Sequence, residues 1–196
     1  MYLGCKFKKI ITVYRQFTKL IKTYHLQTLV DVFIFAVITY GLHWLWWNGI
    51  WKSANAGGFM AFLPEVADWL AHQTFLQSSW FLDFIGYRHI AMDNTLTFPG
   101  TGYVAVLPSC SGLKQFYQII FLFLLYPGPW KHKAWYIPTA LVIMYIVNIS
   151  RIVILSLVLF VWPQHWDFIH MWILRPFFYV VIFAEWVFWN EHFRKL

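Results

Sequence analysis

Few residues of this chain carry a charge, and only two are cysteine. Lys, Arg, Asp and Glu make up 12% of the 196 residues, whereas 60% are hydrophobic and 22% are aromatic. Because soluble domains usually carry about a quarter charged residues, this deficit excludes an ordinary soluble domain. The composition indicates a protein whose helices lie in a lipid bilayer.

Acidic residues are scarce where basic residues are most frequent. The formal net charge is +7, a sign that can indicate nucleic-acid binding. The lysines and arginines, however, gather at the two chain ends and in one short loop, where they flank apolar segments instead of forming a patch. This distribution favours a role in membrane orientation, and no nucleic-acid partner is expected.

Four apolar segments predict transmembrane helices and therefore an all-α multi-pass membrane protein. A helix rises about 1.5 Å per residue and needs about 20 residues to cross a hydrocarbon core of about 30 Å. The second segment is short and ends at a Pro-Gly-Pro sequence, whereas the third is long enough to require tilt or protrusion. The predicted spans are Leu29–Trp47, Gly112–Tyr126, Ala134–Val161 and Met171–Trp189.

The distribution of basic residues predicts which ends of the spans face the cytoplasm. Lysines and arginines are concentrated before Asp31, in the loop 127–133 and at the C-terminus. By the positive-inside rule these regions are cytoplasmic, so both termini of an inner-membrane protein are expected on that side. The loops 48–110 and 162–170 are poor in Lys and Arg and are expected at the outer, periplasmic face.

The chain is expected to form one membrane-embedded domain, 29–196, preceded by an interfacial segment, 1–28. In that segment apolar residues recur three or four apart with lysines between them. The pattern predicts an amphipathic helix on the cytoplasmic membrane surface, with packing against the spans as the alternative. Within the domain, the catalytic core is expected over 103–189.

The long outer loop 48–110 is expected to contain two structured parts. The segment 57–84 predicts one or two helices at the outer interface, because Glu65 and Asp68 argue against a full crossing, although crossing is left open. The following segment, 87–106, alternates in polarity around a Pro-Gly dipeptide. This alternation predicts a small β-hairpin that leads the chain toward the second cysteine.

The two cysteines, Cys5 and Cys110, fall on opposite sides of the predicted membrane, which excludes an intramolecular disulfide. Cys110 lies in the stretch LPSCSGLK, at the start of an apolar helix. A helix N-terminus favours the thiolate form of a cysteine, and Gly112 leaves backbone N–H groups accessible for holding an oxyanion. Taken alone, Cys110 is better interpreted as a small apolar residue at an interface.

Other polar residues lie at the same predicted depth as Cys110. Asn148 and Arg151 are three residues apart and lie on one face of the third span. Arg151 is about 25 Å along the helix from the inner end of this span, which places it near the outer face. Snorkelling to lipid headgroups is the alternative role for this arginine. His170 closes the short outer loop. A thiol, a guanidinium and an imidazole at one depth provide a nucleophile, an oxyanion-stabilising cation and a proton shuttle.

The order of these motifs resembles the exosortase/archaeosortase family, and in particular its compact single-domain members from Bacteroidetes-type bacteria. The resemblance covers about 103–189. Its motifs read Cys110-Ser111-Gly112 at a helix start, Asn148-Ile149-Ser150-Arg151-Ile152 in the next helix, and His170 before a last aromatic-rich helix.

The resemblance implies a membrane-embedded cysteine transpeptidase that cleaves C-terminal sorting signals through a thioester acyl-enzyme. Cys110 would be the nucleophile, Arg151 would stabilise charge, and His170 would act as acid and base. The archaeal branch has an arginine at the third position, so Arg175 is the alternative to His170. The residues expected to bind substrate are Ser111, Gly112, Asn148 and Arg175.

The partners implied are exported proteins that end in a short motif, an apolar helix and a basic tail, together with membrane lipids. The acceptor nucleophile, and therefore transfer or hydrolysis, is left open. No cofactor is expected, and a metal site is disfavoured because His165 and His170 lack a third ligand beyond Asp167. The alternative function is a non-enzymatic scaffold or lipid-binding subunit of an exopolysaccharide or secretion system.

Overall fold

The structure is a computed structural model that describes residues 27–55, 57 and 60–193. The amphipathic helix predicted before residue 27 lies outside these residues. The chain divides into two compact units, 1–41 and 42–196, and each is described by itself. The described part of the first unit is the beginning of helix α2 (Gln27–Leu45), and all other elements belong to the second unit. The predicted boundary after residue 28 stays a prediction.

Three helical stretches of the described chain are long and apolar enough to cross a bilayer, which confirms the predicted all-α membrane fold. They contain the predicted spans 29–47, 134–161 and 171–189. The first and third stretches change from α-helical to π-helical geometry partway along. The elements are α2, η1 (Trp46–Ile50) and α3 (Trp51–Asn55) in the first; α6 (Trp130–Val161) in the second; and η3 (Pro163–His165), α7 (Trp166–Phe168), η4 (Ile169–Leu174) and α8 (Arg175–His192) in the third.

The predicted second span is the shorter helix α5 (Leu113–Leu125). Its 13 residues correspond to about 20 Å, less than the thickness of a hydrocarbon core. Lys133 closes its end, because the ammonium donates to the carbonyls of Leu124 at 3.1 Å and Tyr126 at 2.8 Å. These bonds satisfy backbone acceptors that the end of a helix leaves unpaired.

Within the outer-loop segment 57–84, the structure has one continuous helix, α4 (Leu63–Phe84). It packs against α6 and α5. Ala67 and Ala71 on its buried face are fully inaccessible to solvent, and such small side chains let neighbouring backbones approach closely. The expectation that this helix lies at the outer interface stays a prediction.

A small antiparallel sheet follows α4, with three strands where two were expected. Its strands are paired in the order β1-β2-β3. The hairpin around Pro99-Gly100 is present as predicted, and the additional strand pairs through a two-residue turn at Asp93 and Asn94, whose φ values are 47° and 58°. Positive φ at both positions is typical of type I′ hairpin turns. The strands are β1 (Ile90–Met92), β2 (Thr95–Phe98) and β3 (Gly102–Ala105).

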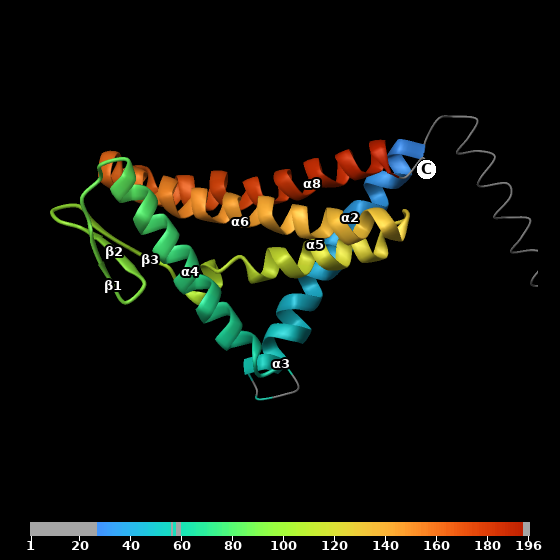
Figure 1. Cartoon of the computed structure of the whole chain (residues 1–196), viewed down its shortest axis with the longest axis horizontal. Coiled ribbons are helices and arrows are strands. Elements are labelled where there is room, and N and C mark those ends of the chain that lie inside the picture. The colour runs from blue at the N-terminus through green and yellow to red at the C-terminus, as the bar shows by residue number, and fades with distance from the viewer. Residues whose placement is uncertain (1–26, 56, 58–59, 194–196) are drawn as a thin grey trace, which may run out of the picture. The chain divides into compact units, whose positions relative to one another are not determined.

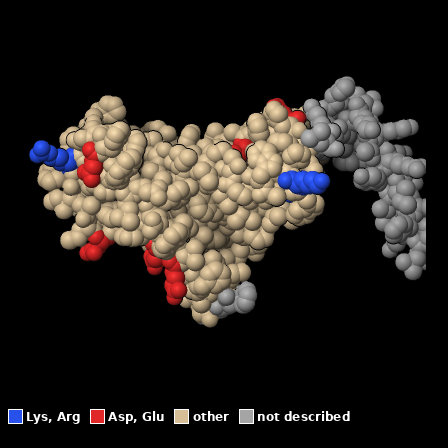
Figure 2. Space-filling view, in the orientation of Figure 1, with Lys and Arg blue, Asp and Glu red and all other residues tan. Residues whose placement is uncertain are grey.

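Helix α6 is the element on which the second unit is built. Figure 1 shows α8 running along it and α5 beside it, with α4 inclined across toward the sheet. The sheet is attached to this unit through a shared core, in which Leu96 and Phe98 pack with Phe75 of α4 and Ile152 of α6. Charged side chains are sparse on the face shown in Figure 2, as expected for helices surrounded by lipid. The sheet thereby delivers the chain to Cys110 at the side of α6.

Candidate active site

Cys110 lies at the end of a short 3₁₀ turn, η2 (Pro108–Cys110), and not inside α5. Its backbone N–H donates to the carbonyl of Leu107 at 2.7 Å. The next residue, Ser111, accepts a hydrogen bond on its hydroxyl from the N–H of Leu113 at 3.2 Å and so satisfies one donor at the start of α5. We call residues 108–112 the cysteine turn. The thiol therefore precedes the helix by a fixed and compact connection.

Gly112 completes the cysteine turn in a left-handed conformation, with φ +82°. A Cβ atom at this position would lie 3.2 Å from the amide nitrogen of Asn148. Both the backbone conformation and the space therefore favour glycine. The close approach lets α6 lie directly against the cysteine turn.

Asn148 anchors the cysteine turn to α6. Its side-chain amide donates to the carbonyl of Cys110 at 2.9 Å and approaches the hydroxyl of Thr74 on α4 at 3.5 Å. Only 1% of Asn148 is exposed, so these contacts are shielded from water. Asn148 and Gly112 are not among the residues that line the cavity described below. The structure therefore places them behind its wall, and substrate contact by either stays a prediction.

Arg151 follows Asn148 by one helical turn and meets His170 of η4. Its Nη2 lies 2.9 Å from Nε2 of the imidazole, and its guanidinium lies over the ring of Phe178. Because a guanidinium can only donate, Nε2 must accept, so in this pairing the imidazole is neutral and carries its proton on Nδ1. Arg151 is only 9% exposed. It therefore turns into the protein and does not snorkel to lipid headgroups.

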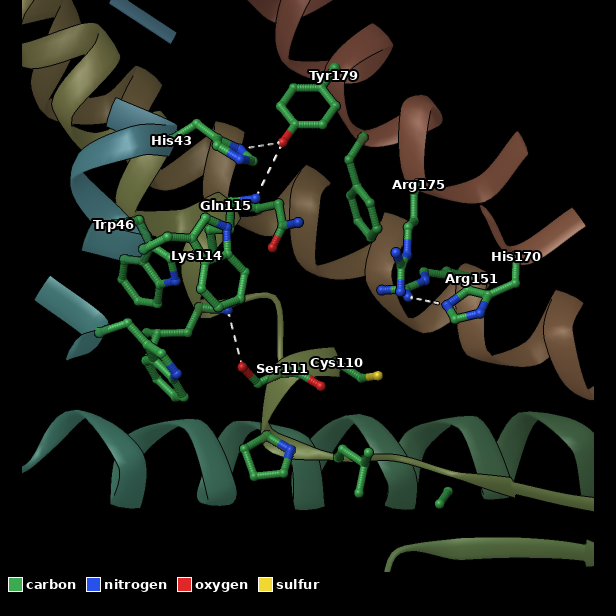
Figure 3. A pocket seen from close by; sticks show the side chains of 18 of the residues that line it. His43, Trp46, Cys110, Ser111, Lys114, Gln115, Arg151, His170, Arg175 and Tyr179 are labelled. Carbon is green, nitrogen blue, oxygen red and sulfur yellow. Dashed lines mark hydrogen bonds between the residues drawn. The ribbon is translucent and has the colours of Figure 1, made fainter. Parts of the chain in front are cut away.

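Cys110, Arg151 and His170 line one cavity of about 670 Å³, together with Ser111 and Arg175. In Figure 3 the thiol points to the side of the cavity on which Arg151 and His170 lie. The thiol and the guanidinium therefore face the same cavity. The structure thus brings together three residues that the sequence placed at a common depth only.

The other end of the cavity contains residues that the sequence analysis did not assign to the site. Here Lys114 of α5 and His43 at the end of α2 both bond to the hydroxyl of Tyr179 on α8, at 3.2 Å and 2.9 Å respectively. Trp46 lies beside them (Figure 3). Lys114 was visible as a charge in the first turn of an apolar helix, whereas no sequence pattern connects Tyr179 with His43.

Both π-helical segments adjoin this cavity. Trp46 and Trp47 belong to η1, and His170 belongs to η4. A π-helical turn holds one more residue between hydrogen-bonded groups than an α-helical turn, and such turns occur frequently at functional sites. The π-helical backbone segments and the polar side chains therefore indicate the same cavity as the functional site.

The fold and this cavity define a multi-pass helical membrane protein with a cysteine, an arginine and a histidine at one site. A family model described as transmembrane exosortase (Exosortase_EpsH) matches residues 12–190. The chain therefore belongs to the transmembrane exosortase family. Its membership supports a membrane-embedded, transpeptidase-like role. No curated protein and no solved structure matches the chain.

Proposed function

We propose that this protein is a membrane cysteine transpeptidase or peptidase that cleaves C-terminal sorting signals of exported proteins. The observation that carries the proposal is the single cavity lined by Cys110, Arg151 and His170, which come from three different elements. A cysteine nucleophile needs a proton acceptor and a group that stabilises the oxyanion. These two side chains can supply both functions without a cofactor.

The first half-reaction forms a thioester. His170 separates from Arg151 as substrate binds, and its Nε2 takes the proton of the Cys110 thiol. The sulfur attacks the scissile carbonyl carbon, and the guanidinium of Arg151 donates to the oxygen that becomes negatively charged. The tetrahedral intermediate collapses, the C–N bond breaks, and the imidazolium returns its proton to the departing amine.

The second half-reaction releases the processed protein. An acceptor nucleophile, either an amine or water, attacks the thioester carbonyl and transfers its proton to His170. The C–S bond breaks, and the imidazolium of His170 returns the proton to the sulfur. The acceptor decides between transfer and hydrolysis, and both outcomes use the same residues in the same order.

The substrate in this proposal is an exported protein whose C-terminus carries a short motif, an apolar helix and a basic tail. Its helix would dock laterally from the lipid, and its motif would meet Cys110 at the periplasmic face of the inner membrane. Both termini of the enzyme would be cytoplasmic, as the basic residues at the chain ends indicate. Ser111 and Arg175, which line the cavity, would contact the motif.

Co-expression with a candidate exported protein tagged at its C-terminus tests the proposal. Tag loss is followed with the native chain and with Cys110→Ala, Arg151→Ala and His170→Ala at matched membrane levels. Cys5→Ser is the matched control for the loss of a thiol, and His165→Ala is the control for the loss of an exposed imidazole. We expect tag loss to stop with Cys110→Ala and to continue with both controls.

Two further outcomes separate the alternatives. A hydroxylamine-sensitive adduct between enzyme and substrate, absent from Cys110→Ala, would identify the thioester. Tag loss that continues unchanged in Cys110→Ala would end the nucleophile assignment. If Cys110→Ala also supports every cellular role of the native chain, the protein acts as a non-enzymatic scaffold or lipid-binding subunit.

A further inference from the structure

The cavity that Cys110 lines has an unusual charge composition. Lys114, Arg151 and Arg175 line the cavity, and no Asp or Glu is among the described residues that line it. Cations inside an apolar, membrane-embedded chain are costly unless an anion compensates them. The cavity is therefore built for a negatively charged ligand.

Lys114 is held in place with unused hydrogen-bonding capacity. Its ammonium donates to the hydroxyl of Tyr179 at 3.2 Å and lies over the ring of Trp47 at 5.5 Å. The hydroxyl of Tyr179 also lies 2.9 Å from Nδ1 of His43, which fixes its position. An ammonium has three N–H donors, so two remain for a ligand. These neutral neighbours orient the charge of Lys114 without neutralising it.

The wall around Lys114 is aromatic. The cavity is lined by Trp46 and Trp47 of η1 and by Trp51 at the start of α3, all at the end of the first apolar stretch. Tryptophan is enriched at the level of lipid headgroups, where its ring contacts apolar groups and its N–H contacts polar ones. This pairing of a lysine with tryptophans matches a phosphate that is carried by an apolar tail more closely than it matches a carboxylate on a peptide.

We propose that Lys114, with Tyr179 and the three tryptophans, forms a binding subsite for the phosphate of a phospholipid headgroup. Lysine binds phosphate as a point charge. The subsite shares the cavity of Cys110 and lies at its other end (Figure 3). A lipid bound there would present its headgroup to the same space that the thiol faces.

Native mass spectrometry of the full chain in dodecyl maltoside, a detergent without phosphate, tests the subsite. The probes are dioctanoyl phosphatidic acid and dioctanoylglycerol, which differ only in the phosphate. We expect the native chain to bind the phosphatidic acid at least tenfold more tightly, because a charge-assisted hydrogen bond contributes an order of magnitude or more to affinity. Binding is measured without turnover, so its outcome is independent of the proposed transpeptidation.

Matched variants identify the residue responsible. Lys114→Met keeps the length of the side chain but removes the charge, and we expect it to abolish the preference for phosphatidic acid. Lys114→Arg should keep the preference, which shows that the cavity remains folded. Lys52→Met is the control, because Lys52 is exposed on the neighbouring helix α3 and does not line the cavity. An unchanged preference in Lys114→Met would overturn the proposal.

Competing ligands distinguish the sources of the negative charge. If inorganic phosphate binds at Lys114 and phosphatidic acid does not, the ligand of the subsite is a free anion. This result would overturn the lipid assignment. The tripeptide amide acetyl-Ala-Glu-Ala tests for a peptide carboxylate. If it binds in a Lys114-dependent way and phosphatidic acid does not, the subsite binds a peptide carboxylate and the lipid assignment is overturned. If neither compound displaces bound phosphatidic acid, the result supports a phospholipid as the occupant of the subsite.

Discussion

The side-chain amide of Asn148 donates to the backbone carbonyl of Cys110 at 2.9 Å. One turn further along the same helix, Arg151 reaches His170. The position of the thiol and the position of its charge partner are therefore both set by α6. A displacement of α6 moves the two together, so their separation is preserved even where neighbouring helices shift. Because both residues belong to α6, the spacing of Asn148 and Arg151 in the sequence sets the geometry of the site.

Replacing Gly112 by alanine tests how closely the cysteine turn must approach α6. We expect Gly112→Ala to lower the free energy of unfolding by about 2 kcal/mol or more, since left-handed backbone costs a non-glycine residue roughly 1–2 kcal/mol and the new Cβ would lie 3.2 Å from Asn148. Gly100→Ala is the matched control, because Gly100 also has positive φ (+87°) but open space around its Cα. Thermal unfolding in detergent measures stability, and only Gly112→Ala should also lose processing activity. Equal losses of activity in both variants would contradict this account.

Removing the charge of Arg151 should reduce the reactivity of the Cys110 thiol. In a Cys5→Ser background, we expect Arg151→Gln to slow alkylation of Cys110 by iodoacetamide about tenfold at neutral pH. The reason is that a nearby cation stabilises the thiolate by on the order of 1 kcal/mol or more. The rate is followed by mass spectrometry of the alkylated chain. The variant Arg175→Gln is the control that shows whether the loss of any cation in the cavity slows alkylation. Equal alkylation rates in the native chain and in Arg151→Gln would contradict direct stabilisation of the thiolate by Arg151.

The geometry favours His170 over Arg175 as the third catalytic residue. His170 is bonded to Arg151 and can carry a proton, whereas an arginine remains protonated and cannot act as a base. We therefore expect His170→Ala to reduce processing by at least a hundredfold, within the range typical of a lost acid–base group. Arg175→Ala should reduce it less and mainly by weakening substrate binding. A larger loss in Arg175→Ala than in His170→Ala would reverse the assignment.

Membrane orientation can be measured with the two native cysteines. We expect a charged, membrane-impermeant methanethiosulfonate reagent to label Cys110 in intact cells with a permeabilised outer membrane. Cys5, retained in a Cys110→Ala chain, should be labelled only after the inner membrane is disrupted. The physical reason is the excess of lysine and arginine at both chain ends. Labelling in the opposite order would place the proposed active site in the cytoplasm.

Much of the helical architecture follows from hydrophobicity, because length and composition alone decide whether a helix can cross a bilayer. The ranges 29–47, 134–161 and 171–189 all fall within stretches that meet this requirement. The third strand was missed although it had a signal. Asp and Asn both tolerate positive φ, so Asp93-Asn94 between short β-forming segments predicts a hairpin turn.

The sequence predicted only the depth in the membrane at which each residue of the site lies. Counting along a helix gives the level of Arg151 in the membrane, but the neighbour it faces depends on how α6 packs against other helices. The burial of Asn148 behind the cavity wall had no sequence signal for the same reason. A polar residue in an apolar helix predicts that a partner exists, and tertiary packing decides whether that partner is a ligand or the backbone of Cys110.

The π-helical segment η4 couples the geometry of the site to its own backbone hydrogen bonds. In an α-helix, His170 and Arg175 would point about 140° apart, since each residue advances the helix by roughly 100°. A segment with hydrogen bonds between residues five apart instead brings both toward one side, and both line the cavity. Deleting one residue within η4 and restoring α-helical winding would place the two residues four apart and about 40° from each other, so both would still face the cavity. Restoring α-helical winding without a deletion would instead separate them by about 140°. This part of the protein is therefore expected to tolerate the loss of one residue in η4 better than the loss of its π-helical hydrogen bonds.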